Sequence, residues 1–145
     1  MQNSVKILTE DDKYIYGILN QSSTADSKVV IFVHGFTGDA NEHQYFNAVP
    51  FFNTKGFATF RFNFYGRQPD ARKTSEVSLM NHINDTRAVI DHLSSQFDEI
   101  YLVGHSLGAC VVSLVDKTNV KRIVLWDPAN GFASPQEKGW FLIVT

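Results

Sequence analysis

A serine between two glycines is the residue best suited to covalent chemistry in this sequence. Gly104, Ser106 and Gly108 form a G-x-S-x-G pattern between an apolar, strand-like stretch and a stretch of small and aliphatic residues typical of a helix. In that setting the serine occupies a sharp strand-to-helix turn, with a positive φ and a hydroxyl that stands clear of the sheet. The N-terminus of the following helix favours negative charge beside the hydroxyl. The pattern predicts a nucleophilic serine at residue 106.

A serine that attacks a carbonyl carbon needs hydrogen-bond donors for the oxyanion that forms. The backbone N–H of Leu107, directly after the serine, is the first expected donor. The second is expected from the loop "HGFTG" at 34–38, which follows the continuous apolar run at 29–33. We assign it to the N–H of Phe36, because the preceding His-Gly lets the backbone turn inward. Two such donors stabilise an acyl-transfer transition state by several kcal/mol.

The general base is the group that the sequence does not supply in an obvious place. The chain has five histidines, none of which follows the nucleophile: His34, His43, His82, His92 and His105. We expect the ring of His105 to point away from the serine. His82 and His92 are expected on the solvated side of a helix. His43, near the strand ends, is the least implausible base of the five.

One carboxylate follows the nucleophile at the end of a strand-like run. Asp127 closes the run 121–126 and precedes Pro128. It is either a candidate acid of a catalytic triad or a turn residue that hydrogen-bonds to its own backbone. No metal site is expected, because the sequence has a single cysteine, Cys110, and no His-x-x-x-His spacing. Cys110 is interpreted as a small buried apolar residue.

The elements that must position these residues alternate between strands and helices. Residues 4–9 and 13–19 have the two-residue period of strands and predict a hairpin. Further strands are expected at 29–33, 57–64, 99–104 and 121–126, and helices at 43–55, 79–97 and 106–116. Such alternation predicts an α/β fold, a mostly parallel sheet with helices on both faces and an N-terminal β-hairpin. Ligands of such sheets bind at the carboxyl ends of the strands.

Composition and charge disfavour several classes of partner. The 145 residues carry a net charge of -2, and the basic residues are scattered, so neither nucleic acid nor an anionic membrane is expected. No apolar run approaches the roughly 18 residues that a membrane span needs. The N-terminus lacks the pattern of a signal peptide, and one cysteine cannot form a disulfide within the chain. We therefore expect a cytoplasmic protein.

Four segments together resemble the α/β-hydrolase family, in particular its lysophospholipase-like, serine-aminopeptidase-like and cinnamoyl-esterase-like members. They are "VVIFVHGFTGD" (29–39), "GFATFRFNFYGR" (56–67), "VGHSLGA" (103–109) and "IVLWDPA" (123–129). The resemblance implies a serine hydrolase that acts on carboxylic esters, thioesters or amides of a small acyl substrate through an acyl-enzyme on Ser106, without a cofactor. It also implies that His34 is structural and braces the expected oxyanion loop at 34–38. The alternative is a non-catalytic protein that keeps the fold and binds an acyl ligand or a partner.

The sequence also departs from that family. Family members place the acid and the histidine after the nucleophile, on strands beyond the one that matches 121–126. We therefore expect residues 1–145 to form a single domain that corresponds to the N-terminal portion of the fold, without its last strands and helices. Strand 121–126 would then be an exposed edge through which the chain could self-associate. The strand-like tail at 139–145 could pair with it instead, and the short connection at 127–139 favours antiparallel pairing.

Overall fold

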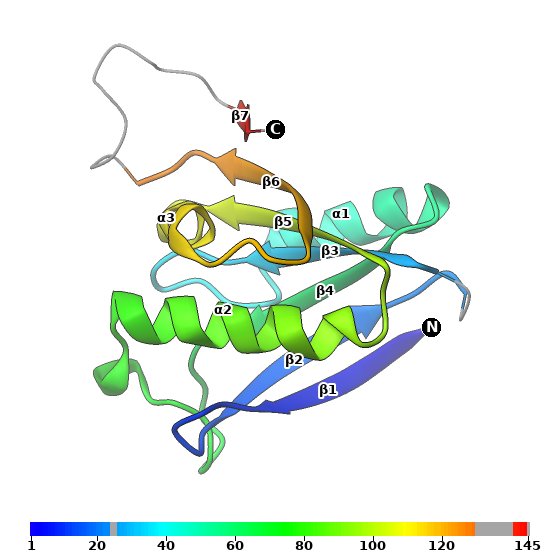
Figure 1. Cartoon of the computed structure of the whole chain (residues 1–145). Helices are drawn as coiled ribbons and strands as arrows, with labels where there is room; N and C mark the ends of the chain where they lie inside the picture. The colour runs from blue at the N-terminus through cyan, green and yellow to red at the C-terminus, as the bar shows by residue number, and fades with distance from the viewer. Residues whose placement is uncertain (24–25, 130–140, 145) are drawn as a thin grey trace.

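Strands of both directions form one sheet (Figure 1). The computed structural model describes residues 1–23, 26–129 and 141–144, and in these residues the sheet has seven strands in the order β1-β2-β4-β3-β5-β6-β7. The strands are β1 Gln2–Leu8, β2 Tyr14–Asn20, β3 Lys28–Val33, β4 Ala58–Asn63, β5 Glu99–His105, β6 Val120–Trp126 and β7 Phe141–Val144. Four middle strands are parallel, in the order β4, β3, β5 and β6. Strand β2 pairs antiparallel with β4, β1 pairs antiparallel with β2, and β7 pairs antiparallel with β6. The predicted α/β fold with an N-terminal hairpin is confirmed.

Helices cover both faces of this sheet, as expected. Helix α1 (His43–Thr54) lies on one face, and α2 (Leu79–Ser94) and α3 (Leu107–Leu114) lie on the other (Figure 1). A short 3-10 helix, η1 (Thr74–Glu76), lies between β4 and α2. The apolar core divides accordingly, into a large cluster on the side of α2 and α3 and a smaller one around Tyr45 of α1. Strand β3 contributes to both clusters, because its side chains alternate between two buried faces.

The predicted helix 43–55 ends close to its expected boundary. Helix α1 stops at Thr54, and Gly56 adopts a φ of 76°, a conformation that glycine reaches without strain. The predicted helix 79–97 is shorter than expected, since α2 ends at Ser94. Phe97 is nevertheless buried, and its N–H donates to the carbonyl oxygen of Leu93 at 2.9 Å. The apolar residue at position 97, which led to the longer predicted helix, is therefore buried although it lies beyond the helix end.

The expectation that His82 lies on the solvated side of its helix is wrong. His82, Asp85 and Thr86 are all buried, whereas Leu79 is 40% exposed. The His82 ring stacks on Phe64 with centroids 4.0 Å apart, and the hydroxyl of Thr86 donates to the His82 carbonyl oxygen at 2.7 Å. The first turns of α2 thus bury a polar face, which meets Phe64 directly after β4 and Arg72 in the connection to α2.

The C-terminal strand occupies the edge of β6. Residues Phe141–Val144 pair antiparallel with Ile123–Trp126, so the direction predicted for a pairing tail is confirmed. The edge of β6 is therefore not open along these four residues, in contrast to the exposed edge expected at 121–126. Self-association through this edge stays a prediction. The remainder of the tail prediction, residues 139, 140 and 145, lies outside the described residues.

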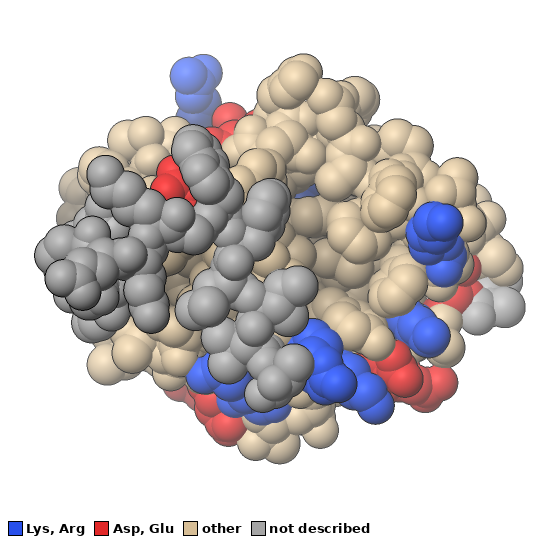
Figure 2. All heavy atoms as spheres, turned by 90° about the horizontal axis from the view of Figure 1, so that it is seen from above, with Lys and Arg blue, Asp and Glu red and all other residues tan. Residues whose placement is uncertain are grey.

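Charged side chains of both signs lie around the margin of the face seen from above (Figure 2), and uncharged side chains fill much of its middle. Within the described ranges, no helix is long and apolar enough to cross a bilayer.

Candidate active site

Ser106 occupies the turn between β5 and α3. Its φ of 53° and ψ of -119° lie in a region that non-glycine residues rarely adopt, which confirms the predicted positive φ. Backbone hydrogen bonds hold this conformation: the Ser106 N–H donates to the Trp126 carbonyl oxygen at 3.0 Å, and the Ser106 carbonyl oxygen accepts from Ala109 at 3.1 Å and from Ala129 at 3.2 Å. The end of β6 and the start of α3 therefore both support the serine turn.

The two glycines of the pattern allow a close approach of backbones. A Cβ atom at Gly108 would lie 2.1 Å from the carbonyl oxygen of Val33 in β3. A Cβ atom at Gly104 would lie 2.4 Å from the carbonyl oxygen of Gly108. Any side chain at these positions would separate α3 from the sheet and move the serine.

The oxyanion loop lies against the serine. A Cβ atom at Gly35 would be 3.1 Å from the Ser106 Cβ and 3.5 Å from its Oγ, so the loop after β3 and the serine turn meet at this glycine. Residues 35 and 106 are far apart in sequence, but parallel β3 and β5 are neighbours and both end at this edge of the sheet.

His34 holds the oxyanion loop through two hydrogen bonds. The ring is buried, and its Nε2 accepts a hydrogen bond from the Phe64 N–H at 3.2 Å, which places the ring proton on Nδ1. Nδ1 then donates to the Gly35 carbonyl oxygen at 2.7 Å. Burial lowers the pKa of His34, so the ring stays neutral. With both nitrogens engaged, His34 has the structural role that the sequence suggested.

This contact also orients the next N–H. The peptide bond between Gly35 and Phe36 is trans, so its carbonyl oxygen and N–H point in opposite directions. Since the Gly35 oxygen faces the His34 ring, the Phe36 N–H points away from that ring. Among the described residues, no backbone carbonyl accepts from the N–H of Phe36 or of Leu107. The two N–H groups proposed as oxyanion donors are thus unengaged by the backbone.

Side chains from β4 and the residues after it hold the rest of the loop, a function that the sequence analysis missed. Asn63 Oδ1 accepts from the Ala40 N–H at 2.7 Å, and Arg61 Nη1 donates to the Ala40 carbonyl oxygen at 3.0 Å. The hydroxyl of Tyr65 donates to the Gly38 carbonyl oxygen at 3.4 Å. Polar residues at alternate positions of the strand "FRFNF" were the signal that could have revealed this support.

The other histidines are engaged away from the serine hydroxyl. The exposed His43 contacts the amide of Asn47 through Nε2 at 3.0 Å. The His105 ring packs on Trp126 with centroids 5.3 Å apart, and His82 stacks on Phe64. Within the part of the chain that the structure describes, no histidine nitrogen hydrogen-bonds to Ser106 Oγ.

Asp127 follows β6 directly and has a φ of 44°, and its side chain is exposed. It lies between Trp126 and Ala129, the two residues whose backbones hydrogen-bond to Ser106, but no described contact joins its carboxylate to the serine. Cys110 is buried, as expected, and its thiol donates to the Ala129 carbonyl oxygen at 3.7 Å. Among the described residues, no group of three or more His, Cys, Asp or Glu side chains could hold a metal ion.

Comparison with known proteins identifies the family. A Mycoplasma genitalium protein named as an esterase/lipase is 31% identical over 107 residues, which are 70% of this chain and 38% of that protein. Est1E of Butyrivibrio proteoclasticus, solved with ferulic acid, superposes with a TM-score of 0.72 at 25% identity, over 82% of this chain and 50% of that one. The Pyrococcus furiosus esterase Pf2001 superposes with a TM-score of 0.74 at 24% identity, over 88% and 50%.

The chain therefore spans half or less of the length of these relatives. The family model of the alpha/beta hydrolase fold matches residues 28–141, which include the oxyanion loop, the serine turn and β6. With this match and the serine turn between β5 and α3, the chain belongs to the α/β-hydrolase fold family.

Proposed function

We propose that Ser106 is the nucleophile of a serine hydrolase that cleaves carboxylic esters through an acyl-enzyme. The observation that carries the proposal is the strained turn of Ser106, with a φ of 53°, against the backbone of Gly35. Strain of this kind persists at functional sites because it exposes and orients a reacting group. The esterase/lipase name of the Mycoplasma genitalium relative supports the choice of esters as the substrate class.

The reaction would proceed in two balanced steps. Ser106 Oγ attacks the ester carbonyl carbon, its proton passes to a general base, and the carbonyl oxygen becomes an oxyanion beside the N–H groups of Phe36 and Leu107. The bond to the alcohol oxygen then breaks, and the base returns the proton to the departing alcohol. Water attacks the acyl-enzyme in the same manner and releases the carboxylic acid and the free serine. Water is the only co-reactant.

The base and its orienting acid are the incomplete part of this site. Both nitrogens of His34 are engaged, and those of the other described histidines make no contact with Ser106. We propose that the base comes from outside the described residues, and we retain Asp127 as a candidate acid because it follows the strand that supports the serine turn.

A second candidate function is binding without turnover. The same lack of a described base favours a protein that holds an acyl ligand or a partner on an intact scaffold. The two functions differ in whether the Ser106 hydroxyl reacts.

A fluorophosphonate probe, read by mass spectrometry, distinguishes them. Preorganised donors act on the developing oxyanion even without a base, so we expect slow but selective modification of Ser106. Ser113 in the same helix is the internal control, because its hydroxyl donates to the Cys110 carbonyl oxygen instead of facing the loop. Ser106→Ala should remove the adduct. Modification of Ser113 at the same rate, or none at Ser106, would contradict the hydrolase proposal and favour the binding function.

A further inference from the structure

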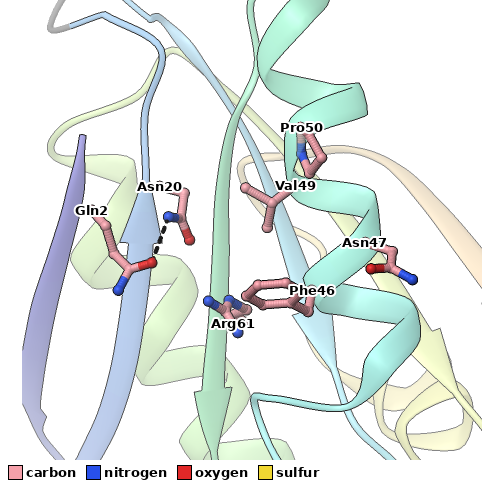
Figure 3. A pocket seen from close by; sticks show the side chains of 7 residues that line it. All are labelled: Gln2, Asn20, Phe46, Asn47, Val49, Pro50 and Arg61. Carbon is pink, nitrogen blue, oxygen red and sulfur yellow. Dashed lines mark hydrogen bonds between the residues drawn. The ribbon is translucent and has the colours of Figure 1, made fainter.

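A cavity of about 400 Å³ lies between α1 and the outer strands of the sheet (Figure 3). The side chains that line it include Gln2 of β1, Asn20 of β2, Arg61 of β4, and Phe46, Val49 and Pro50 of α1. None of its lining residues belongs to the oxyanion loop 34–38 or to the serine turn. Its volume is in the range of small-molecule sites.

Arg61 is a buried cation in this cavity without an anionic partner. The residue is 2% exposed, and its Nη1 donates to the Ala40 carbonyl oxygen and to Asn41 Oδ1 at 2.8 Å. Nε is buried without a partner, and no carboxylate within the described ranges pairs with the guanidinium. Burial alone lowers the pKa of Arg61. A buried charge of this kind is costly unless an opposite charge compensates it.

Arg72 shows how this chain otherwise buries an arginine. It is 5% exposed, similar to Arg61, but it forms ion pairs with Asp85 at 2.9 Å and with Asp11 at 2.7 Å. Both carboxylates also accept a second hydrogen bond from the guanidinium. Among the described residues, Arg61 thus lacks the carboxylate partners that compensate the buried charge of Arg72.

The remaining lining residues define what kind of anion fits. Asn20 is 8% exposed, and its amide donates to Gln2 Oε1 at 3.1 Å while its Oδ1 has no partner. On the opposite wall, the Phe46 ring lies 5.4 Å from the guanidinium carbon, beside Val49 and Pro50 (Figure 3). One side of the cavity is therefore polar and cationic, and the α1 side is mainly apolar, with Asn47 as its polar lining residue.

We infer that this cavity binds a small monocarboxylate with an apolar body. The carboxylate would take the edge of the guanidinium that carries Nε and Nη2, which donate to no described residue, because a planar carboxylate matches two parallel N–H donors. The body of the ligand would lie against Phe46, Val49 and Pro50. Phe46 is 59% exposed, so its ring can move aside to admit the ligand.

Isothermal titration of the 145-residue chain with three probes tests the ligand class. Sodium benzoate carries both features, benzamide lacks the charge, and inorganic phosphate lacks the apolar body. We expect saturable 1:1 binding of benzoate, at least tenfold tighter than that of benzamide or phosphate. Equal affinity for benzamide would overturn the role of the charge, and equal affinity for phosphate would overturn the role of the apolar wall.

Two variants of α1 locate the site. Phe46→Ala removes the apolar wall, and Phe51→Ala removes a ring of the same helix that is equally exposed, at 60%, but does not line the cavity. Benzoate affinity should fall at least threefold in the first variant and stay unchanged in the second. Equal effects, or none, would overturn the proposal.

Arg61→Met should abolish benzoate binding. Because Arg61 also holds Ala40, this variant could fail to fold, so NMR of the unmodified chain provides an independent readout. Benzoate should shift the side-chain amide signals of Asn20 and Gln2. Shifts confined to residues 34–38 and 104–107 would place the ligand at the serine and overturn the inference.

Discussion

At the scale of single residues, Ser106 and Gly35 depend on one another. The strained serine turn presents the hydroxyl, and the absence of a side chain at Gly35 lets the oxyanion loop approach it, with a virtual Cβ atom only 3.1 Å from that of the serine. His34 fixes the peptide that carries the Phe36 N–H. In the proposed reaction these contacts would stabilise an oxyanion, but they would not activate the hydroxyl.

We therefore expect the 145-residue chain to hydrolyse p-nitrophenyl esters slowly, at a residual rate that does not depend on Ser106. Without a base the hydroxyl is a weak nucleophile at neutral pH. When the triad of a serine protease was removed, substrate binding and the oxyanion hole still accelerated hydrolysis roughly 10³–10⁴-fold over water. A residual acceleration of this kind does not depend on the serine hydroxyl. Ser106→Ala should consequently change the initial rate, followed at 405 nm by spectrophotometry, very little.

A high turnover that Ser106→Ala abolishes would contradict this expectation. It would mean that a histidine within the chain, His43 first, or a second chain supplies the base.

At the scale of elements, α3 and α2 contact the sheet in different ways. Helix α3 approaches β3 through the bare backbone of Gly108. Helix α2 packs through its apolar face and also buries three polar side chains, His82, Asp85 and Thr86. Asp85 accepts two hydrogen bonds from Arg72, and His82 stacks on Phe64. The position of α3 therefore depends on the absence of a side chain, and that of α2 on the partners of its buried polar groups together with its apolar face.

Gly108→Ala should destabilise the protein severely. The new Cβ atom would lie 2.1 Å from the carbonyl oxygen of Val33, a backbone atom that cannot move without separating α3 from β3. We expect a loss of at least about 3 kcal/mol in the free energy of unfolding, measured by urea denaturation. Gly56→Ala is the control: it has open space but a φ of 76°, and should cost only about 1 kcal/mol. Equal losses would contradict the close-approach argument.

The buried His82 should make stability dependent on pH. Burial, followed by the electrostatic influence of His34 and Arg72, lowers the pKa of His82 to about 4, from 6.5. Between these pH values the unfolded chain binds a proton that the folded chain excludes. The contribution of His82 to the free energy of unfolding is therefore fully present above pH 6.5 and is lost as the pH decreases towards 4. The loss is of the order of 3 kcal/mol.

His82→Phe should keep the ring contact with Phe64 and reduce this loss, as measured by urea denaturation at pH 7 and pH 4.5. His43→Phe, at an exposed histidine, should retain the loss of the unmodified chain. If His82→Phe shows the same dependence on pH as the unmodified chain, another group is responsible.

At the scale of the whole molecule, the sheet carries antiparallel strands at both sides of a parallel centre. Strands β1 and β2 flank β4, and β7 flanks β6. The pairing of Phe141–Val144 with Ile123–Trp126 satisfies backbone groups that would otherwise form an open edge. The C-terminal strand should therefore control association between chains.

Deletion of residues 140–145 should increase self-association. The deletion exposes the N–H and C=O groups of β6 along Ile123–Trp126, which can then pair with a second chain. Multi-angle light scattering should show a concentration-dependent rise in mass that the full chain lacks. Leu142→Pro should act in the same direction, because proline removes a backbone donor from β7. A constant monomer mass for both variants would rule out association through this edge.

Local features of the sequence determined the serine turn and the type of most elements. The G-x-S-x-G pattern predicts a positive φ at Ser106 because the geometry of one turn depends on adjacent residues. The continuous apolar run at 29–33 likewise predicts the buried β3. A strand with one face in solvent alternates apolar and polar residues, whereas a strand that is covered on both faces is apolar throughout. The antiparallel direction of β7 followed from the length of the preceding connection.

Only the tertiary structure decided which distant groups meet. The burial of His82 depends on Phe64, the pairing of Asp85 on Arg72, and the support of the oxyanion loop on Arg61. The energy of a buried polar group depends on partners that other segments bring to it, and a helical pattern read along α2 alone assigns such a group to solvent. The sequence therefore determined where the serine turn and the proposed nucleophile stand, because adjacent residues fix one turn, whereas tertiary packing decided which side chains of β4 and α2 meet their partners.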